Sequence, residues 1–137
     1  MNVAVKVRSI FDKANFIRDL GIAITGVGEG WCETELQVTE RHRQQHGYVH
    51  AGVLATMADH TAGGAARSAS GTKDVITVEF KINFFRPATG ERLRCRAQVL
   101  RAGKSIIVAE AEVFSVESTG EKLVAKLTET CAVIEQQ

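Results

Sequence analysis

The sequence predicts a single α+β domain in which an antiparallel sheet wraps around one central helix. Three observations lead to this prediction: a helical repeat of apolar residues near the N-terminus, a middle segment rich in Ala and Gly, and four later segments in which apolar and polar residues alternate. The chain has 137 residues, of which 45% are hydrophobic and 24% charged, so it can bury one core. We therefore treat residues 1–137 as one domain.

Residues 1–20 are expected to form an N-terminal helix. Apolar residues recur there at helical spacing, with charged residues between them, at Val7, Ile10, Phe11, Ala14 and Ile17. Gly21 follows and is expected to end the helix.

One strand and one loop are expected between residues 22 and 50. Glycines at positions 26, 28 and 30 precede a segment, Cys32 to Val38, that alternates as a half-buried strand does. Residues 39–50 are polar and lack periodicity, so they are expected to form a loop.

Residues 51–69 are predicted to form the central helix. Nine of the sixteen residues from 51 to 66 are Ala or Gly, and such small side chains let a helix approach a sheet closely. Gly63 and Gly64 are expected to weaken this helix near its end.

The second half of the chain is predicted to be almost entirely strand. Alternation covers residues 76–85, 92–99, 105–116 and 122–134, with turns near 101–104 and 118–121. Four antiparallel strands that follow one long helix complete the α+β arrangement.

The net charge of +1 indicates no general attraction to nucleic acid or to an anionic membrane. Charge is nevertheless segregated, because seven basic residues and one acid lie between Lys81 and Lys104. Arg92, Arg94 and Arg96 share one strand face, where they either bind phosphate groups or pair with Glu on neighbouring strands.

The three cysteines, Cys32, Cys95 and Cys131, lie far apart in the sequence and form no CxxC motif. They are therefore expected to be reduced thiols of a cytoplasmic protein rather than disulfide or zinc ligands. All three occupy apolar positions of predicted strands, which disfavours a nucleophilic cysteine. No export signal or membrane-spanning segment is recognisable.

Asp59 is the candidate catalytic residue. It is the only acid between Glu40 and Asp74, and small apolar residues surround it on the predicted helix. A carboxylate that is partly removed from water is a stronger base, as general base or nucleophilic catalysis requires. The solvated helix face is the alternative location for this side chain.

Residues 44–52 form a glycine-containing loop that leads into the N-terminus of the same helix. Unpaired N–H groups near Ala51 and Gly52 are suited to hold a carbonyl oxygen while Asp59 directs water at the carbonyl carbon. This geometry is that of acyl transfer to water.

Residues 46–59, HGYVHAGVLATMAD, resemble the corresponding segment of the hotdog-fold thioesterases of the phenylacetate-pathway (PaaI-like) family. The resemblance continues through Thr77 to residues 83–88 (NFFRPA) and through residues 102–105 (AGKS), and it covers roughly residues 20–135. It implies a hotdog fold, a long central helix wrapped by an antiparallel sheet, and hydrolysis of an acyl-coenzyme A thioester without metal or other cofactor.

The resemblance also implies roles for individual residues. Asp59 activates water or attacks the thioester, and the Ala51 N–H is the oxyanion donor. Gln44 orients the thioester or the water, His50 braces the loop or contacts the carbonyl, and Thr77 is a secondary hydrogen-bonding group. The substrate-binding residues are Gly52, Arg86, Arg101 and Lys104, the last three as contacts of the coenzyme A phosphates.

The implied assembly is a homodimer, or a dimer of dimers forming a homotetramer, with the active site at the subunit interface. One position departs from the family pattern, since Ala51 replaces the usual first Gly of its His-Gly-Gly element. If this position requires a positive φ, Ala is unfavourable there. The length and chemistry of the acyl group remain open.

Three other functions remain open on the residues alone. His46 or His50 with Asp59 resembles the loop histidine and helix acid of hotdog dehydratases and hydratases that act on acyl thioesters. His42, His46 and His50 suit a metal site only on a continuous helix, which Gly47 argues against. A non-catalytic protein that binds an acyl-coenzyme A as a sensor is the third.

Overall fold

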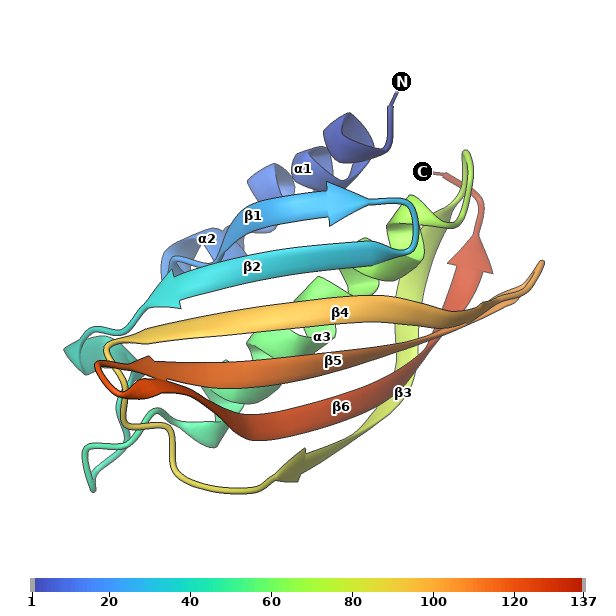
Figure 1. Ribbon diagram of the computed structural model, residues 1–137. Helices are drawn as coiled ribbons and strands as arrows, with labels where there is room; N and C mark the ends of the chain where they lie inside the picture. The colour runs from blue at the N-terminus through green and yellow to red at the C-terminus, as the bar shows by residue number, and fades with distance from the viewer. Residues whose placement is uncertain (1, 137) are drawn as a thin grey trace.

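The computed structural model describes residues 2–136 and confirms the α+β architecture. Within these residues six strands form one antiparallel sheet in the order β1-β2-β4-β5-β6-β3 (Figure 1). The strands are β1 (Ala23–Gly28), β2 (Trp31–Gln37), β3 (Asp74–Phe84), β4 (Arg92–Ala102), β5 (Ile106–Glu117) and β6 (Gly120–Ile134). The α-helices are α1 (Val3–Lys13), α2 (Asn15–Leu20) and α3 (Ala51–Ser68), and a short 3-10 helix covers Glu40–His42.

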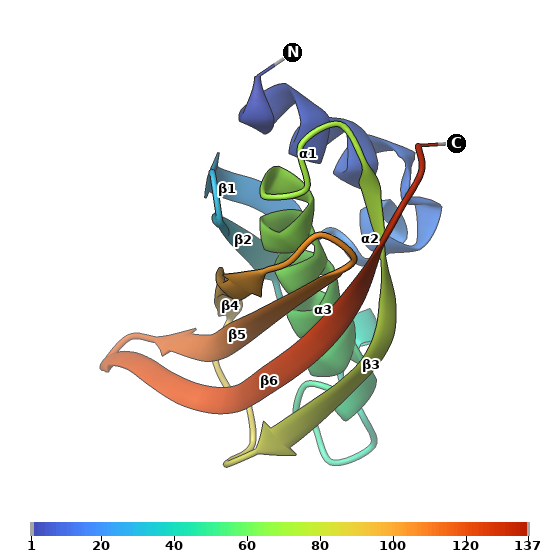
Figure 2. The same ribbon diagram turned by 90° about the vertical axis from the view of Figure 1, so that its right-hand side faces the viewer.

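The sheet curves around α3, as Figure 2 shows from the end of the molecule. Helix α1 packs against α3 and β1, and α2 packs against α3. None of the helices in residues 2–136 has the length and hydropathy needed to span a lipid bilayer.

The expected N-terminal helix is two helices, because Ala14 has an extended conformation (φ −86°, ψ 92°). In one continuous helix, Phe11 and Ile17 would point about 120° apart. The break instead lets both side chains reach the core, where each is at most 5% exposed. Gly21 ends α2 with a φ of 88°, as predicted. The part of the expected helix at Met1 lies outside the described residues.

Strand β1 is an element that the sequence pattern did not reveal. Residues 23–28 pair with β2 as a hairpin, with a bulge between Ile24 and Gly26. Gly26 and Gly28 leave space for the Trp31 ring, which a Cβ at these positions would meet at 3.1 Å and 2.3 Å, respectively. These close contacts explain a glycine-rich sequence that resembles a turn more than a strand.

Helix α3 extends through Gly63 and Gly64 to Ser68, one residue short of the predicted end. Its small residues face the sheet, and Ala58, Ala62, Ala65 and Ala66 are fully buried. A Cβ on Gly64 would lie 3.0 Å from Cys32 Sγ and 3.3 Å from side-chain atoms of α1. Packing of the helix against its neighbours therefore outweighs the low helix propensity of glycine.

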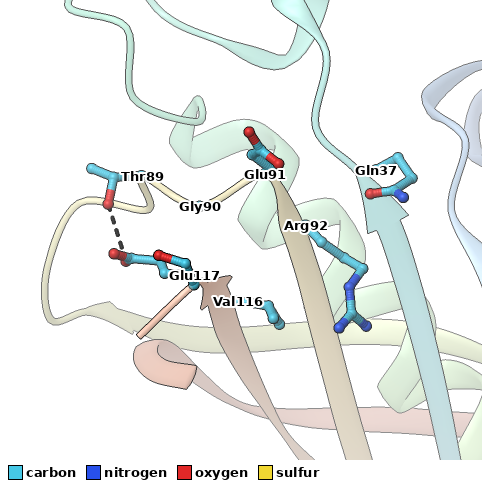
Figure 3. Close-up of a pocket in the computed structure, with 8 residues that line it drawn as sticks. Gln37, Thr89, Gly90, Glu91, Arg92, Val116 and Glu117 are labelled. Atoms are coloured by element: carbon cyan, nitrogen blue, oxygen red, sulfur yellow. Dashed lines mark hydrogen bonds between the residues drawn. The ribbon is translucent and has the colours of Figure 1, made fainter. Parts of the chain in front are cut away.

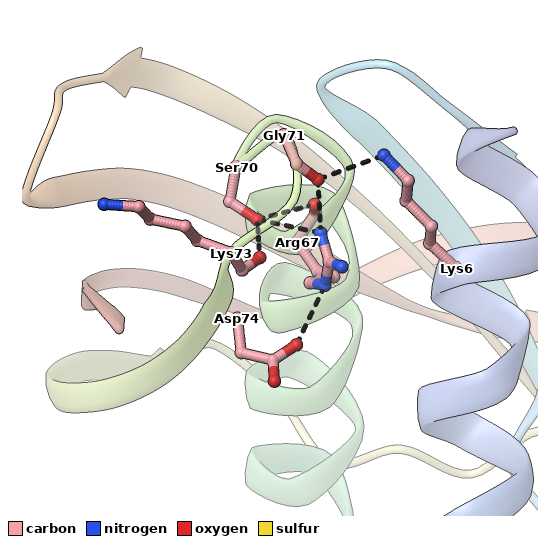
Figure 4. Close-up of polar contacts among 6 residues, drawn as sticks. All are labelled: Lys6, Arg67, Ser70, Gly71, Lys73 and Asp74. Carbon is pink, nitrogen blue, oxygen red and sulfur yellow. Dashed lines mark hydrogen bonds and ion pairs between the residues drawn. The ribbon is translucent and has the colours of Figure 1, made fainter. Parts of the chain in front are cut away.

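The turn between α3 and β3 is held by Arg67, which is only 4% exposed (Figure 4). Its Nε donates to Asp74 Oδ1 (3.1 Å), and its guanidinium also donates to Ser70 Oγ (3.1 Å) and the Gly71 carbonyl (2.9 Å). Lys6 of α1 donates to the same carbonyl (3.0 Å). These bonds fix the start of β3 relative to α3.

The four predicted strands of the second half are confirmed as β3 to β6. Three arginines of β4 pair with acids on β2 and β6, which is the alternative to phosphate binding. The contacts are Arg92–Glu35 (2.6 Å), Arg94–Glu121 (2.7 Å) and Arg96–Glu33 (3.7 Å).

The two adjacent glycines of α3 provide a test of this packing. Gly64→Val is expected to lower the free energy of unfolding by about 1–3 kcal/mol, because the added methyl groups overpack a closed contact. The matched change Gly63→Val should alter it by less than about 1 kcal/mol, since a Cβ at Gly63 meets no atom within 4 Å. Urea denaturation measures both values, and equal losses would contradict the packing argument.

Candidate active site

Asp59 lies in the middle of α3 and contacts Thr77 of β3. Its Oδ1 accepts a 2.8 Å hydrogen bond from Thr77 Oγ1. Both side chains line a pocket of about 110 Å³ whose other walls are Ile10, His60, Gly63, Gly64 and Val75. A carboxylate with a fixed orientation therefore faces a small pocket with mainly apolar walls.

Glu129 of β6 is a second carboxyl group beside Asp59, and the sequence analysis did not identify it. Its backbone pairs with Phe80 of β3, and its side chain is 0% exposed in the inward row of Leu127 and Cys131. Cys131 Sγ donates to its Oε2 (3.2 Å), and Cys131 pairs across the strands with Thr77, the residue that bonds Asp59. The sequence signal that could have identified Glu129 is an acid in the apolar row of an alternating strand.

Burial, with a smaller contribution in the same direction from the neighbouring Asp59, raises the pKa of Glu129 to about 9. Neither carboxyl group forms an ion pair with a Lys, Arg or His of residues 2–136. Glu129 is therefore protonated at neutral pH.

His60 follows Asp59 and forms part of the same pocket wall. Its ring packs edge-on against Phe11 with the centroids 4.3 Å apart, and its buried Nε2 has no hydrogen-bond partner in the described chain. Burial lowers the pKa of His60, while the charge of Asp59 acts in the opposite direction. His60 is therefore a neutral group at neutral pH.

His50 caps the N-terminus of α3. Its Nδ1 accepts a 2.8 Å hydrogen bond from the Gly52 N–H, so the Gly52 donor is occupied. The Ala51 N–H, in contrast, donates to no group within residues 2–136. Ala51 is the first residue of α3 and does not have a positive φ, so replacing the family's glycine causes no backbone strain.

Gln44 organises the loop before α3. Its Oε1 accepts hydrogen bonds from the backbone N–H groups of His46 (2.6 Å) and Tyr48 (3.2 Å). Gln44 and Ala51 line a second pocket, of about 320 Å³, together with Tyr48, Leu54, Phe84 and Arg86.

Within one protomer the predicted residues thus form two separate groups. Asp59 and Thr77 share one pocket, whereas Gln44, Ala51 and Arg86 share another. Eight residues of α-helix separate the Ala51 and Asp59 backbones by about 12 Å along the axis, and the Ala51 N–H points away from Asp59. The two groups of one chain therefore cannot act on the same carbonyl group.

The predicted phosphate contacts are also dispersed. Arg86 lies in the loop that leads into β4, whereas Arg101 and Lys104 lie at and beyond the other end of this strand (Figure 1). All three residues are exposed. One protomer alone does not place them around a common phosphate group.

A larger pocket of about 540 Å³ lies where β2, β4 and β5 meet at one end of the sheet (Figure 3). It contains Thr89, whose Oγ1 donates to Glu117 Oε2 (3.1 Å), and Arg92, which is bonded to Glu35 (2.6 Å). None of the predicted site residues lines it, so this larger pocket and the candidate chemistry are separate.

Two of the three histidines of the alternative functions are engaged elsewhere, and His46 does not line the Asp59 pocket. Both ring nitrogens of His42 are bonded, Nδ1 to the Thr39 N–H (2.9 Å) and Nε2 to the Leu20 carbonyl (2.7 Å). In residues 2–136, no three His, Cys, Asp or Glu side chains gather as a metal-binding group. His50 caps α3 rather than contacting Asp59, which leaves the dehydratase pairing without support in one protomer.

Residues 46–122 match the sequence profile of the thioesterase superfamily. A 1,4-dihydroxy-2-naphthoyl-CoA hydrolase of Listeria monocytogenes is 33% identical over 69% of this chain and 77% of its own. Human acyl-coenzyme A thioesterase 13 is 28% identical over 88% of this chain and 86% of its own.

Solved structures agree with the fold. A thioesterase family protein of Silicibacter pomeroyi superposes with a TM-score of 0.96 at 34% identity, covering 98% of this chain and 100% of its own. The PaaI protein of the phenylacetic acid degradation operon of E. coli superposes with a TM-score of 0.88 over 98% of this chain and 95% of its own. At 24% identity, the latter similarity is one of fold.

The cysteines of the site region are expected to be inert towards thiol reagents. Cys32, Cys95 and Cys131 are fully buried, and burial raises the pKa of each thiol to about 12. In the folded protein at pH 8, an aromatic disulfide reagent should therefore release almost no thiolate, whereas in guanidinium all three thiols should react. Rapid labelling of the folded protein would contradict this prediction and would support a cysteine as the nucleophile.

Proposed function

Because the chain belongs to the thioesterase superfamily and has the hotdog fold of PaaI-like proteins, it is a thioester hydrolase, and we propose that its substrate is an acyl-coenzyme A. In this proposal Asp59 is the general base or nucleophile that produces the free acid and coenzyme A. The observation that supports this role is the hydrogen bond from Thr77 that fixes the Asp59 carboxylate in a pocket with apolar walls.

In the general-base form of the mechanism, Asp59 takes a proton from water as the water oxygen attacks the thioester carbon. The negative oxygen that develops on the thioester carbon accepts a hydrogen bond from the free Ala51 N–H, at the positive end of α3. The C–S bond then breaks, and the leaving thiolate takes the proton from Asp59. As a nucleophile, Asp59 would instead form an anhydride that water hydrolyses. The proposed steps use water and protein groups, with no metal or cofactor.

Because one protomer holds these two groups apart, we propose that a second copy of the chain completes the site. The two copies are proposed to pair along β3. This strand is an edge of the sheet and carries exposed apolar side chains at Ile76 (56%), Val78 (63%), Phe80 (41%) and Phe84 (47%). A long apolar edge strand without cover is a pairing surface, and cyclic dimers pair the same surface on both copies.

A two-fold axis near the middle of β3 would make the two strands antiparallel. The half of β3 that carries Val75 and Thr77 would then lie beside the half of the partner that carries Phe84. This arrangement brings the Asp59 pocket of one protomer to the Ala51 pocket of the other. Two identical composite sites per dimer follow, and a dimer of dimers would hold four.

The remaining expectations belong to the same proposal. Arg86 of one protomer and Arg101 and Lys104 of the other are the proposed contacts of the coenzyme A phosphates, since the antiparallel arrangement brings opposite sheet ends together. His50 supports the loop through its cap on α3.

We propose that residues 1–137 act as one domain. Three buried, unpaired cysteines support a reducing, cytoplasmic location.

Replacement of the central carboxylate tests the chemistry. Asp59→Asn keeps the shape and the acceptor for Thr77 but removes the base, so kcat for acyl-coenzyme A hydrolysis should fall by at least about 100-fold. Thiol release from aromatic and aliphatic acyl-coenzyme A substrates measures this rate, with circular dichroism and gel filtration to match fold and oligomeric state.

Each other result identifies a different function. Unchanged turnover would remove Asp59 from the mechanism. Tight binding of acyl-coenzyme A without turnover by the wild-type protein would indicate a sensor. Conversion of a hydroxyacyl or enoyl thioester would indicate a dehydratase or hydratase.

The oxyanion role of Ala51 can be tested with proline, which lacks the hydrogen of the backbone N–H. Proline is tolerated at the first position of a helix, and His50 already has the extended conformation (φ −60°, ψ 137°) that precedes proline. Ala51→Pro should therefore preserve α3 but reduce kcat about 100-fold or more, as loss of an oxyanion donor does. Ala51→Gly retains the N–H and serves as the control, which should stay near the wild-type rate.

Mixing the two inactive variants tests the composite site. In a heterodimer of Asp59→Asn and Ala51→Pro chains, one site combines both defects and the other has neither. Random assortment of co-refolded chains should then restore about a quarter of the wild-type activity per chain. If each site belonged to one chain, the mixture would stay as inactive as the separate variants.

A further inference from the structure

We propose that Glu129 is a positioning residue for Asp59: it keeps its proton throughout the reaction and donates a hydrogen bond to the Asp59 carboxylate. This inference rests on the proposed catalytic role of Asp59. It adds a residue from β6, a strand in which the sequence analysis identified no site residue.

The position of Glu129 is the first argument. It is 0% exposed in an inward row whose neighbours on either side are Leu127 and Cys131. Its Oε1 is buried and accepts no hydrogen bond within residues 2–136, whereas Oε2 accepts one from Cys131 Sγ (3.2 Å). A buried carboxylate with so few donors would be unstable, but a carboxylic acid has its own hydrogen to donate.

The acceptor for that hydrogen is Asp59. Thr77, which bonds Asp59, pairs with Cys131 on β6, and Cys131 bonds Glu129, so both carboxyl groups flank the Thr77–Cys131 pair between α3 and the sheet. Two ionised carboxylates cannot occupy this position together, so the pair holds one proton. With Glu129 as the acid, Asp59 accepts two hydrogen bonds, one from Thr77 (2.8 Å) and one from Glu129.

The other groups that face Glu129 favour the same protonation state. Asp59 on α3 and Glu79 on β3 are both acidic and raise the pKa of Glu129, whereas the hydrogen bond from Cys131 lowers it. On β5, the residue paired with Glu129 is Ala109, which carries no charge. Burial is the largest cause, and together these groups raise the pKa to about 9.

This arrangement has a direct consequence for Asp59. Two donors on different elements hold its carboxylate in one rotamer and leave its remaining lone pairs for water. Glu129 neither gains nor loses a proton in the cycle, because the proton from water passes to Asp59 and then to the leaving thiolate. Ionisation of Glu129 at high pH would remove one donor and place a second negative charge beside the base.

The pH profile tests the proposal. For the wild-type enzyme, kcat/KM should fall above pH about 9, because Glu129 ionises there. Glu129→Gln keeps a neutral donor at every pH, so it should retain activity near pH 7 and lose the fall at high pH. Spontaneous thioester hydrolysis is subtracted at each pH. A high-pH fall present in both proteins, or in neither, would overturn the proposal.

Two further variants separate positioning from packing. Glu129→Leu keeps the volume but removes the donor, so kcat should decrease about tenfold or more with little change in KM. Glu112→Gln on the outer face of β5 is the matched control and should keep the wild-type pH profile. Activity of Glu129→Leu equal to that of Glu129→Gln would contradict a donor role.

A readout without turnover distinguishes this inference from the proposed function. Carbon-13 NMR of the glutamate carboxyl groups, with Glu129→Gln to assign the signal, measures the titration of Glu129 directly. The midpoint should lie near pH 9 and move down in Asp59→Asn, which removes a neighbouring charge. A midpoint near the ordinary glutamate value would overturn the proposal, whether or not the protein hydrolyses any acyl-coenzyme A.

Discussion

The close approach of α3 to the concave face of the sheet is the constraint on which the rest of the structure depends. Ala58, Ala62 and Ala65 are fully buried at this contact, and a Cβ on Gly64 would lie only 3.0 Å from Cys32 Sγ. With larger residues the helix would stand farther from the sheet, and the short side chain of Asp59 would not reach Thr77. The same composition that makes α3 a poor isolated helix therefore creates the site.

The packing of α3 on the sheet also places the acidic side chains of the two sheet faces in different environments. On the outer face of the sheet the acids are solvated and paired, as in Arg92–Glu35 and Arg94–Glu121. On the inner face, Glu129 forms no ion pair with a basic side chain of residues 2–136, and burial keeps it neutral. Exposed ion pairs add little to stability, whereas an unpaired buried acid has a free-energy cost. Retaining such an acid next to Asp59 is consistent with a use in the reaction.

In the proposed dimer, the open edge of the sheet accounts for the two incomplete groups within one protomer. The loop pocket with Ala51 lies at one end of β3, and the Asp59 pocket lies towards its other end. Along a rigid helix these groups cannot approach each other, but a two-fold axis exchanges the ends of the strand. In this arrangement the apolar edge that would otherwise be an aggregation hazard is also what completes the site.

Local pattern alone predicted the α+β class, the central helix and five of the six strands, and it singled out Asp59 as the candidate catalytic residue. These features repeat over a few residues, so alternation, small-residue content and one isolated acid reveal them. The resemblance of residues 46–59 added the hotdog fold and the loop residues. Strand β1 and the break at Ala14 were missed because contacts with Trp31 and the core decide them.

Glu129 shows where prediction from the sequence ends. Seventy positions separate it from Asp59, and only the registers of β6 with β3 and β5 bring it beneath α3. The alternation of β6 places this acid in the same row as Leu127 and Cys131, but what covers that row and which groups lie beside the acid depend on the packing of the other elements. Burial and the proximity of two carboxyl groups are properties of the packed chain, so only the tertiary structure decided them.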